Sequence, residues 1–81
     1  MVTVYAGQVP VDHDSPVPLY QQVAAFLRER IAKEGLTRLP SLTTITQEYE
    51  VSRPTAESAV KVLVDAGEAI VVPGRGTFVK R

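Results

Sequence analysis

The order of helix caps and turns between Leu39 and Val79 constrains the fold of this chain more than any other feature. Ser41 and Ser52 each precede a short segment whose apolar residues recur at helical spacing, and serine at that place caps a helix N-terminus. Two β-rich runs follow, on either side of a loop at residues 73–76. This order predicts a helix, a tight turn, a second helix and a β-hairpin.

An earlier helix is predicted from about Pro18 to Glu34, because an apolar stripe repeats there at steps of three and four residues. Gly35 is expected to end it in the left-handed conformation. Val51 is expected to fill the space between the two later helices. The last helix is expected to bury a stripe of small and aliphatic side chains, namely Ala56, Ala59, Val60 and Leu63.

The β-rich runs are Ala69–Val72 and Thr77–Lys80, and they are expected to pair as an antiparallel hairpin. The predicted fold class is therefore mainly α with a small β-hairpin wing (α+β). Its architecture is a winged helix-turn-helix, with three helices and a two-stranded wing, over residues 18–81. Residues 1–17 contain Gly7, Pro10 and Pro16, which break regular structure, and are expected to form a tail, either flexible or strand-forming.

Composition excludes several classes of function. The 81 residues include no cysteine, which excludes disulfides, cysteine zinc sites and thiol nucleophiles. The single histidine, His13, has no other ligand at suitable spacing, so no metal site is predicted. Without paired carboxylates, a nucleophile motif or a phosphate loop, we expect neither an enzyme nor a cofactor. With no signal peptide and no apolar run of membrane-spanning length, we expect a cytoplasmic protein that does not contact membranes.

The charge of the chain is balanced but unevenly distributed. Nine basic and nine acidic side chains give a net charge of zero, which argues against nucleic-acid binding because basic side chains supply most of the non-specific affinity. Residues 1–50 carry four basic and six acidic side chains, whereas residues 51–81 carry five basic and three acidic ones. The slightly positive part therefore coincides with the last helix and the hairpin.

Several polar side chains are expected at helix N-termini and in the hairpin loop. Arg53 lies in a first helical turn, from which arginine can bind guanine through two hydrogen bonds; the alternative is a surface charge paired with Glu57. Arg75, between two glycines, either approaches a minor groove or is an ordinary loop charge. Hydroxyl groups near helix N-termini, which bind phosphate well, belong to Ser41, Thr43, Ser52 and Thr55. The two serines are caps first and phosphate ligands second.

Together these motifs make the chain similar to the N-terminal DNA-binding domain of the GntR family of bacterial regulators. The matching segments, in family order and spacing, are Pro18-Leu19-Tyr20, Leu39-Pro40-Ser41, Val51-Ser52-Arg53-Pro54-Thr55 and Gly74-Arg75-Gly76-Thr77-Phe78-Val79. The resemblance covers about residues 18–80 and implies operator binding as a dimer, usually with repression. It also implies a base contact by Arg53, phosphate contacts by Ser52 and Thr55, and a wing contact at Gly76 beside Arg75.

Two positions depart from the family pattern. Thr43 and Glu57 stand where the family usually has arginines, so weak binding or an altered operator is expected. Glu57 repels phosphate, but it can accept a hydrogen bond from cytosine or brace Arg53 and Lys61 from between them. The candidate DNA-binding residues are Ser41, Thr43, Ser52, Arg53, Thr55, Glu57, Lys61, Arg75 and Gly76.

The resulting prediction is a sequence-specific transcriptional regulator, a repressor that binds double-stranded DNA at an inverted repeat, with homodimerisation expected on the operator. A recognition helix at about residues 52–66 enters the major groove, and wing residues 73–76 lie at the minor groove. The alternative is a winged-helix module that docks a protein and binds DNA weakly or not at all.

The family's usual C-terminal effector-binding domain has no counterpart in these residues, so no small-molecule effector is predicted within the chain. The chain is either a free-standing small regulator or a fragment of a longer protein, and the initial Met1 favours the former.

Overall fold

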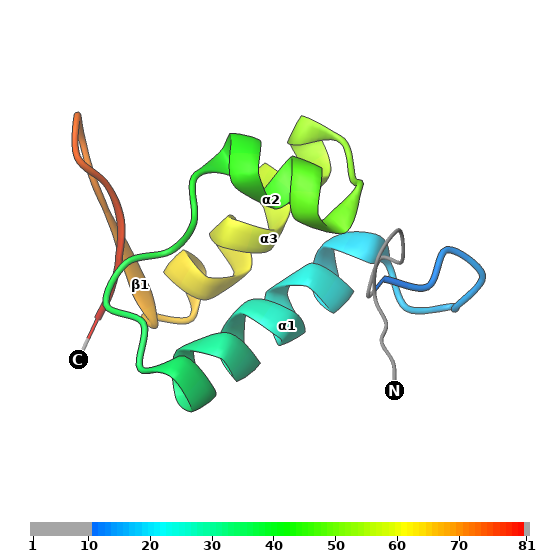
Figure 1. Cartoon of the computed structure of the whole chain (residues 1–81), viewed down its shortest axis with the longest axis horizontal. Coiled ribbons are helices and arrows are strands. Elements are labelled where there is room, and N and C mark those ends of the chain that lie inside the picture. Colours follow the sequence, from blue (N-terminus) through cyan, green and yellow to red (C-terminus); the bar gives the residue numbers. More distant parts are fainter. Residues whose placement is uncertain (1–10, 81) are drawn as a thin grey trace.

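The computed structural model describes residues 11–80, which form three helices and one β-hairpin. The helices are α1 (Leu19–Glu34), α2 (Leu42–Tyr49) and α3 (Arg53–Asp65), and the strands are β1 (Ala69–Val72) and β2 (Gly76–Val79). The hairpin stands at one end of the helical part as a wing (Figure 1). The predicted winged helix-turn-helix is confirmed. Three boundaries differ: α1 begins at Leu19, with Pro18 as its N-cap, and β2 both begins and ends one residue earlier than predicted, at Gly76 and Val79.

The helix ends follow from the cap residues. The Oγ atoms of Ser41 and Ser52 accept hydrogen bonds from the backbone N–H groups of Thr44 and Thr55, at 3.1 and 3.3 Å, and so begin α2 and α3. Gly35 ends α1 in the left-handed conformation, with φ +66°, as predicted. Glu50 takes the same conformation after α2 with φ +52°, which is uncommon for a residue with a Cβ. This reversal makes the short turn between α2 and α3.

The core lies where α3 packs against both α1 and α2 (Figure 1). Val23, Leu27, Ile45 and Leu63 are completely buried and form its centre. The stripe predicted for α3 is buried as expected, and its alanines, with no side chain beyond Cβ, let the helix axes approach closely. Val51, in the turn, is also buried, as predicted.

The structure adds one core residue that the sequence analysis placed in the tail. Val11 is 5% exposed and belongs to the core cluster. The segment after it is tied to α1 by Gln22, whose side chain accepts a hydrogen bond from the Asp12 N–H at 2.7 Å and donates to the Val17 carbonyl at 2.8 Å. The strand suggested for the first residues of the tail lies outside the described residues.

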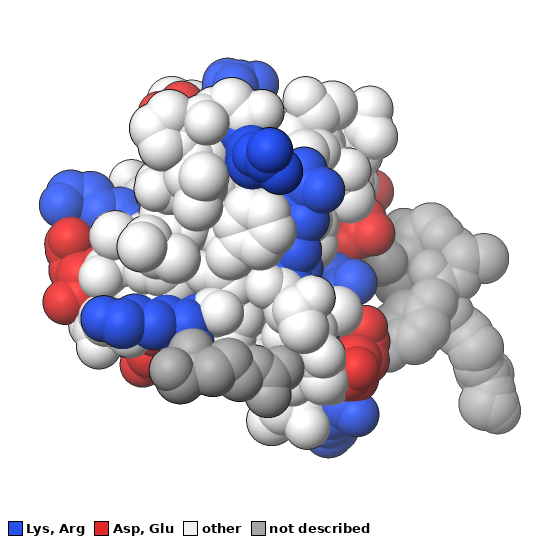
Figure 2. Space-filling model, turned by 90° about the vertical axis from the view of Figure 1, so that its left-hand side faces the viewer, with Lys and Arg blue, Asp and Glu red and all other residues white. Residues whose placement is uncertain are grey.

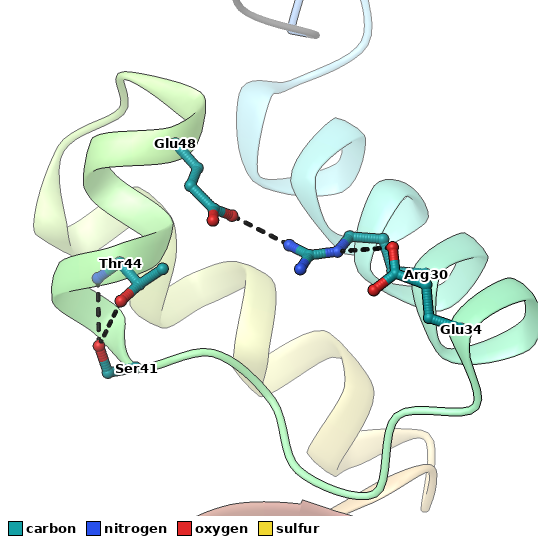
Figure 3. Close-up of polar contacts among 5 residues, drawn as sticks. All are labelled: Arg30, Glu34, Ser41, Thr44 and Glu48. Atoms are coloured by element: carbon teal, nitrogen blue, oxygen red, sulfur yellow. Dashed lines mark hydrogen bonds and ion pairs between the residues drawn. The ribbon is translucent and has the colours of Figure 1, made fainter.

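Arg30 fixes α2 against α1. Its guanidinium lies 2.9 Å from the Glu48 carboxylate on α2 and 3.5 Å from Glu34 on its own helix (Figure 3). A hydrogen bond with the Tyr49 side chain raises the pKa of Arg30 above its usual value, against a smaller opposing effect of burial. The Tyr49 ring in turn stacks on Phe26 of α1, with ring centroids 6.0 Å apart. The first helix of the helix-turn-helix is therefore held by both apolar and ionic contacts.

A third segment of the chain pairs with the two strands of the wing, and the sequence did not indicate it. β1 and β2 pair antiparallel, with Ala69 opposite Val79 and Val72 opposite Gly76. The free edge of β2 is covered by residues 37–39: the Leu39 N–H donates to the Thr77 carbonyl, and the Val79 N–H donates to the Thr37 carbonyl, both at 2.9 Å. Because residues 37–39 lead directly into the cap of α2, the wing is joined to the helix-turn-helix by backbone hydrogen bonds.

Candidate nucleic-acid interface

Three segments distant in the sequence meet around one open cavity of about 360 Å³. They are the N-terminus of α2, the first turn of α3 and the tip of the wing. Of the candidate residues, the ones that line this cavity are Ser41, Thr43, Arg53 and Gly76. The fold therefore brings together the parts that the sequence analysis had selected independently of one another.

The two caps have the same local geometry. Besides accepting its capping hydrogen bond, each serine Oγ donates to a threonine Oγ1 three residues later at 3.0 Å, from Ser41 to Thr44 and from Ser52 to Thr55. Because each threonine oxygen accepts, its own proton remains available to donate outward. Thr44 therefore has the same place at the start of α2 as Thr55 has at the start of α3, although Thr44 was not among the predicted DNA-binding residues. The repeated Ser-x-x-Thr spacing was the signal that could have identified it.

Arg53 is exposed at the start of α3 and lies 3.6 Å from the Glu57 carboxylate. This is the ion pair that the sequence analysis gave as the alternative to a base contact. Lys61 does not share that carboxylate, because its Nζ lies 2.9 Å from Asp65, one turn further along the helix. The prediction that Glu57 braces both cations is wrong for Lys61. It holds for Arg53, which leaves this arginine oriented but partly neutralised.

Arg75 is exposed at the tip of the wing, and none of the ion pairs among residues 11–80 involves it. Its carbonyl oxygen accepts a hydrogen bond of 2.6 Å from Nη2 of Arg38. Gly76, next in the chain, has a φ of +122°, and a Cβ there would lie 3.1 Å from the same nitrogen. Nothing in the local sequence around Arg38 indicates that this side chain lies beside the wing, so Arg38 was not among the predicted site residues.

The zero net charge of the chain does not extend to this part of the surface. Residues 38–43, 52–61 and 73–77 together contain four basic side chains and one acidic side chain. Figure 2 views the wing end of the molecule, where one group of basic side chains lies near the middle of the view, while acidic side chains and the other basic ones lie toward its margins. The local excess of positive charge suits a polyanionic ligand better than the overall composition suggested.

The described residues, 11–80, contain no group of three or more histidine, cysteine, aspartate or glutamate side chains that could hold a metal ion. Within the same range, no helix combines the length and the apolar character required to cross a bilayer.

Comparison with known proteins gives a consistent result. The chain is 38% identical over 66 residues to the mannosyl-D-glycerate transport/metabolism system repressor MngR of Escherichia coli. It is 32% identical over 74 residues to the HTH-type transcriptional repressor NagR of Bacillus subtilis. These alignments cover 78% and 88% of this chain but only 28% and 30% of the two relatives. The chain therefore spans less than a third of the length of these regulators.

The fold is also that of a solved protein–DNA complex. The crystal structure of AraR(DBD) in complex with operator ORE1 superposes with a TM-score of 0.75 and 30% sequence identity, over 90% of this chain and 93% of that one. The pattern described as "Bacterial regulatory proteins, gntR family" matches residues 19–79. Because that match includes all three helices and the wing, the protein belongs to the gntR family of bacterial regulatory proteins.

Proposed function

We propose that this chain is the operator-reading domain of a transcriptional repressor, with α3 in the major groove and the wing tip at the minor groove. One observation carries the proposal: the N-terminus of α2, the start of α3 and the wing tip meet on one cavity. The same fold is bound to operator DNA in the AraR complex. Two regulators similar to this chain, MngR and NagR, are repressors, which favours repression over activation.

In this proposal each exposed group has a distinct role. Arg53, in the first turn of α3, reads a base edge, because an arginine there can donate two hydrogen bonds to guanine. The hydroxyls of Thr43, Thr44 and Thr55, beside the serine caps, donate to phosphate oxygens and set the register on the duplex. Arg75 lies along the minor groove. Lys61, farther along α3, adds a weaker electrostatic contact because Asp65 partly neutralises it.

A single α3, with 13 residues, covers only a few base pairs. We therefore expect two chains on one operator, related by a two-fold axis that matches an inverted repeat. Selection of bound fragments from random double-stranded DNA, followed by footprinting, tests this expectation. The expected product is a repeated half-site in inverted orientation, with the two centres about 10 base pairs or a multiple of that apart. Failure to enrich any fragment at low salt would contradict the proposal.

Replacing Arg53 with alanine distinguishes base reading from general attraction to DNA. We expect Arg53→Ala to weaken operator binding by about 1–3 kcal/mol and to relax preference at a single base pair. Lys33→Ala is the matched control, because it removes one exposed positive charge on α1, away from the cavity. Equal losses for the two variants, with base preference intact, would show that Arg53 acts only as a charge.

One observation favours a second candidate function. The Glu57 carboxylate lies on the exposed face of α3 within 3.6 Å of Arg53, where it opposes phosphate. A winged-helix module that binds a protein through α3 would tolerate this carboxylate more easily than a DNA reader. Stoichiometric capture of a partner protein, combined with no DNA enrichment by selection, would support this candidate over the first.

A further inference from the structure

Arg38 is the side chain that links the wing tip to the helix-turn-helix. It lies three residues before the Ser41 cap of α2, and its backbone bridges to Phe78 in β2. Its guanidinium reaches past that strand to the hairpin loop, where Nη2 donates to the Arg75 carbonyl at 2.6 Å. The same guanidinium lies over the Phe78 ring, 5.5 Å from the centroid. One side chain thus contacts both the strand and the turn of the wing.

The wing needs such a contact because its two strands are short. It consists of two strands of four residues each, and an isolated two-stranded hairpin is marginally stable in water. Residues 37–39 support the middle and base of β2 through backbone hydrogen bonds at Thr77 and Val79. At the tip, next to the pairing of Val72 with Gly76, the Arg75 N–H donates to the Val72 carbonyl at 2.9 Å. The Arg38 guanidinium is the added support at that point.

Gly76 has the geometry required to admit this guanidinium. A Cβ at Gly76 would lie 3.1 Å from Nη2 and 3.2 Å from Nε of Arg38, which is tighter than ordinary van der Waals contact. A Cβ at Gly74, on the other side of Arg75, would meet nothing within 4 Å. The two glycines of the loop are therefore not equivalent. The space beside Gly76 is occupied by the side chain that holds the tip.

We propose that Arg38 is a positioning residue that fixes the wing tip relative to α2, so that Arg75 and the α2 N-terminus reach DNA in one defined geometry. The proposal rests on the proposed function, because it assigns Arg38 an effect on operator binding through Arg75. The 2.6 Å hydrogen bond to the Arg75 backbone, rather than to its side chain, makes this assignment specific. It leaves the Arg75 guanidinium free for DNA while the chain beneath it is held.

A double-mutant cycle tests whether Arg38 acts through Arg75. Arg38→Met keeps an unbranched apolar stem over Phe78 and removes the charge and the donors. We expect it to weaken binding to the selected operator about tenfold, the equivalent of one lost charge-assisted hydrogen bond. In an Arg75→Ala background the same change should weaken binding less than about threefold, because the two effects are coupled. Lys33→Met, which removes a distant charge, serves as the control.

Two outcomes of the cycle would overturn the proposal. Additive losses would mean that Arg38 contacts DNA independently of the wing, and a loss no larger than that of Lys33→Met would mean that only net charge matters. Because Arg38 is exposed and its replacement leaves the buried Leu39 in place, we expect each variant to fold. Circular dichroism of each variant checks that its helices are intact.

Amide hydrogen exchange without DNA gives a second test that is independent of the proposed function. Arg38→Met should accelerate exchange of the Arg75 amide about tenfold, while the Val60 amide in the buried stripe of α3 stays unchanged. Unchanged exchange at Arg75 would overturn the positioning role even if DNA affinity fell. Failure of the wild-type chain to bind any DNA would instead contradict the proposed function. Accelerated exchange at Arg75 would, even then, support the conclusion that the hydrogen bond from Arg38 holds the wing tip.

Discussion

At the scale of single residues, the pairing of Arg53 with Glu57 has the largest consequence for recognition. Both side chains are more than half exposed, and an exposed pair one helical turn apart contributes only about 0.2–0.5 kcal/mol to helix stability. Such a pair separates easily when a better partner for the arginine arrives. We therefore expect Glu57 to influence the proposed contact of Arg53 with DNA much more than it influences the fold.

Replacing Glu57 with glutamine should strengthen binding to DNA generally. Removing the carboxylate eliminates repulsion of phosphate and leaves Arg53 fully charged, so we expect affinity to rise about threefold to tenfold at low salt, for selected and unrelated sequences alike. Fluorescence anisotropy with both kinds of duplex measures this, and Glu29→Gln on α1 is the matched control. If binding to the selected operator falls while unrelated DNA is unaffected, Glu57 reads a base, as a carboxylate can do with cytosine.

The two glycines of the wing loop should differ in their tolerance of a side chain. Gly76→Ala forces a non-glycine residue to a φ of +122° and places a Cβ 3.1 Å from Arg38, so we expect the free energy of unfolding to fall by about 1–3 kcal/mol. Gly74→Ala has a φ of +75° and open space, and it should cost about 1 kcal/mol. Urea unfolding measures both, and a larger loss at Gly74 would contradict the contact between Gly76 and Arg38.

The contrast between Arg53 and Arg38 shows which site residues a sequence can reveal. Arg53 follows a cap serine by one position, so its place in the first turn of α3 could be predicted locally. The contact of Arg38 with Arg75 joins residues 37 positions apart, and no local pattern encodes it. The partner of Lys61 was missed for another reason: Glu57 and Asp65 both lie four residues away on the helix, and spacing alone does not choose between them.

At the scale of the elements, α2 and α3 begin with the same Ser-x-x-Thr arrangement, in which a serine caps the helix and a threonine keeps a proton to donate. The N-terminus of a helix also carries a partial positive charge. In the proposed function, each helix end would bind a phosphate with donors that the cap already orders. This arrangement would help a chain with few cations to position itself on a duplex.

Removing the cap of α3 should weaken the fold and the DNA contact together. Ser52→Ala leaves the Thr55 N–H without its partner, so we expect the free energy of unfolding to fall by about 1 kcal/mol. The Thr55 hydroxyl also loses the group that orients it. Thermal unfolding measures the first effect, and Ser58→Ala, at an exposed position within α3, is the control. Equal stability of the two variants would show that the cap is not needed to hold α3.

Helix boundaries were predictable within one residue because caps, prolines and left-handed glycines act over a single turn of chain. The exposed and buried faces of α3 also followed from helical spacing alone. The third strand-like partner of the wing and the burial of Val11 were not predictable in this way. Both depend on contacts between distant segments, and short runs such as residues 37–39 carry too few residues to show a β pattern.

At the scale of the whole molecule, the zero net charge of the chain should limit how strongly DNA binding depends on salt concentration. Among the cations near the cavity, Arg53 and Lys61 each have an acidic partner, so few phosphates are neutralised. We expect the logarithm of the binding constant to fall with the logarithm of salt concentration with a slope of about −2 to −4 per protomer. Anisotropy titrations over a series of salt concentrations measure it. A much steeper slope would mean that basic residues outside this surface also contact DNA.

Residues 37–39 are bound to β2 by backbone hydrogen bonds and continue directly into α2, so we expect the wing and the helix-turn-helix to move as one body. In the proposed function, such a body would not adjust the distance between its contacts with the major and minor grooves. The duplex would then supply the adjustment, by bending or by changing the width of its minor groove. We expect operators to be distinguished partly at base pairs that no side chain touches, where flexible steps lower the elastic cost of fitting the protein.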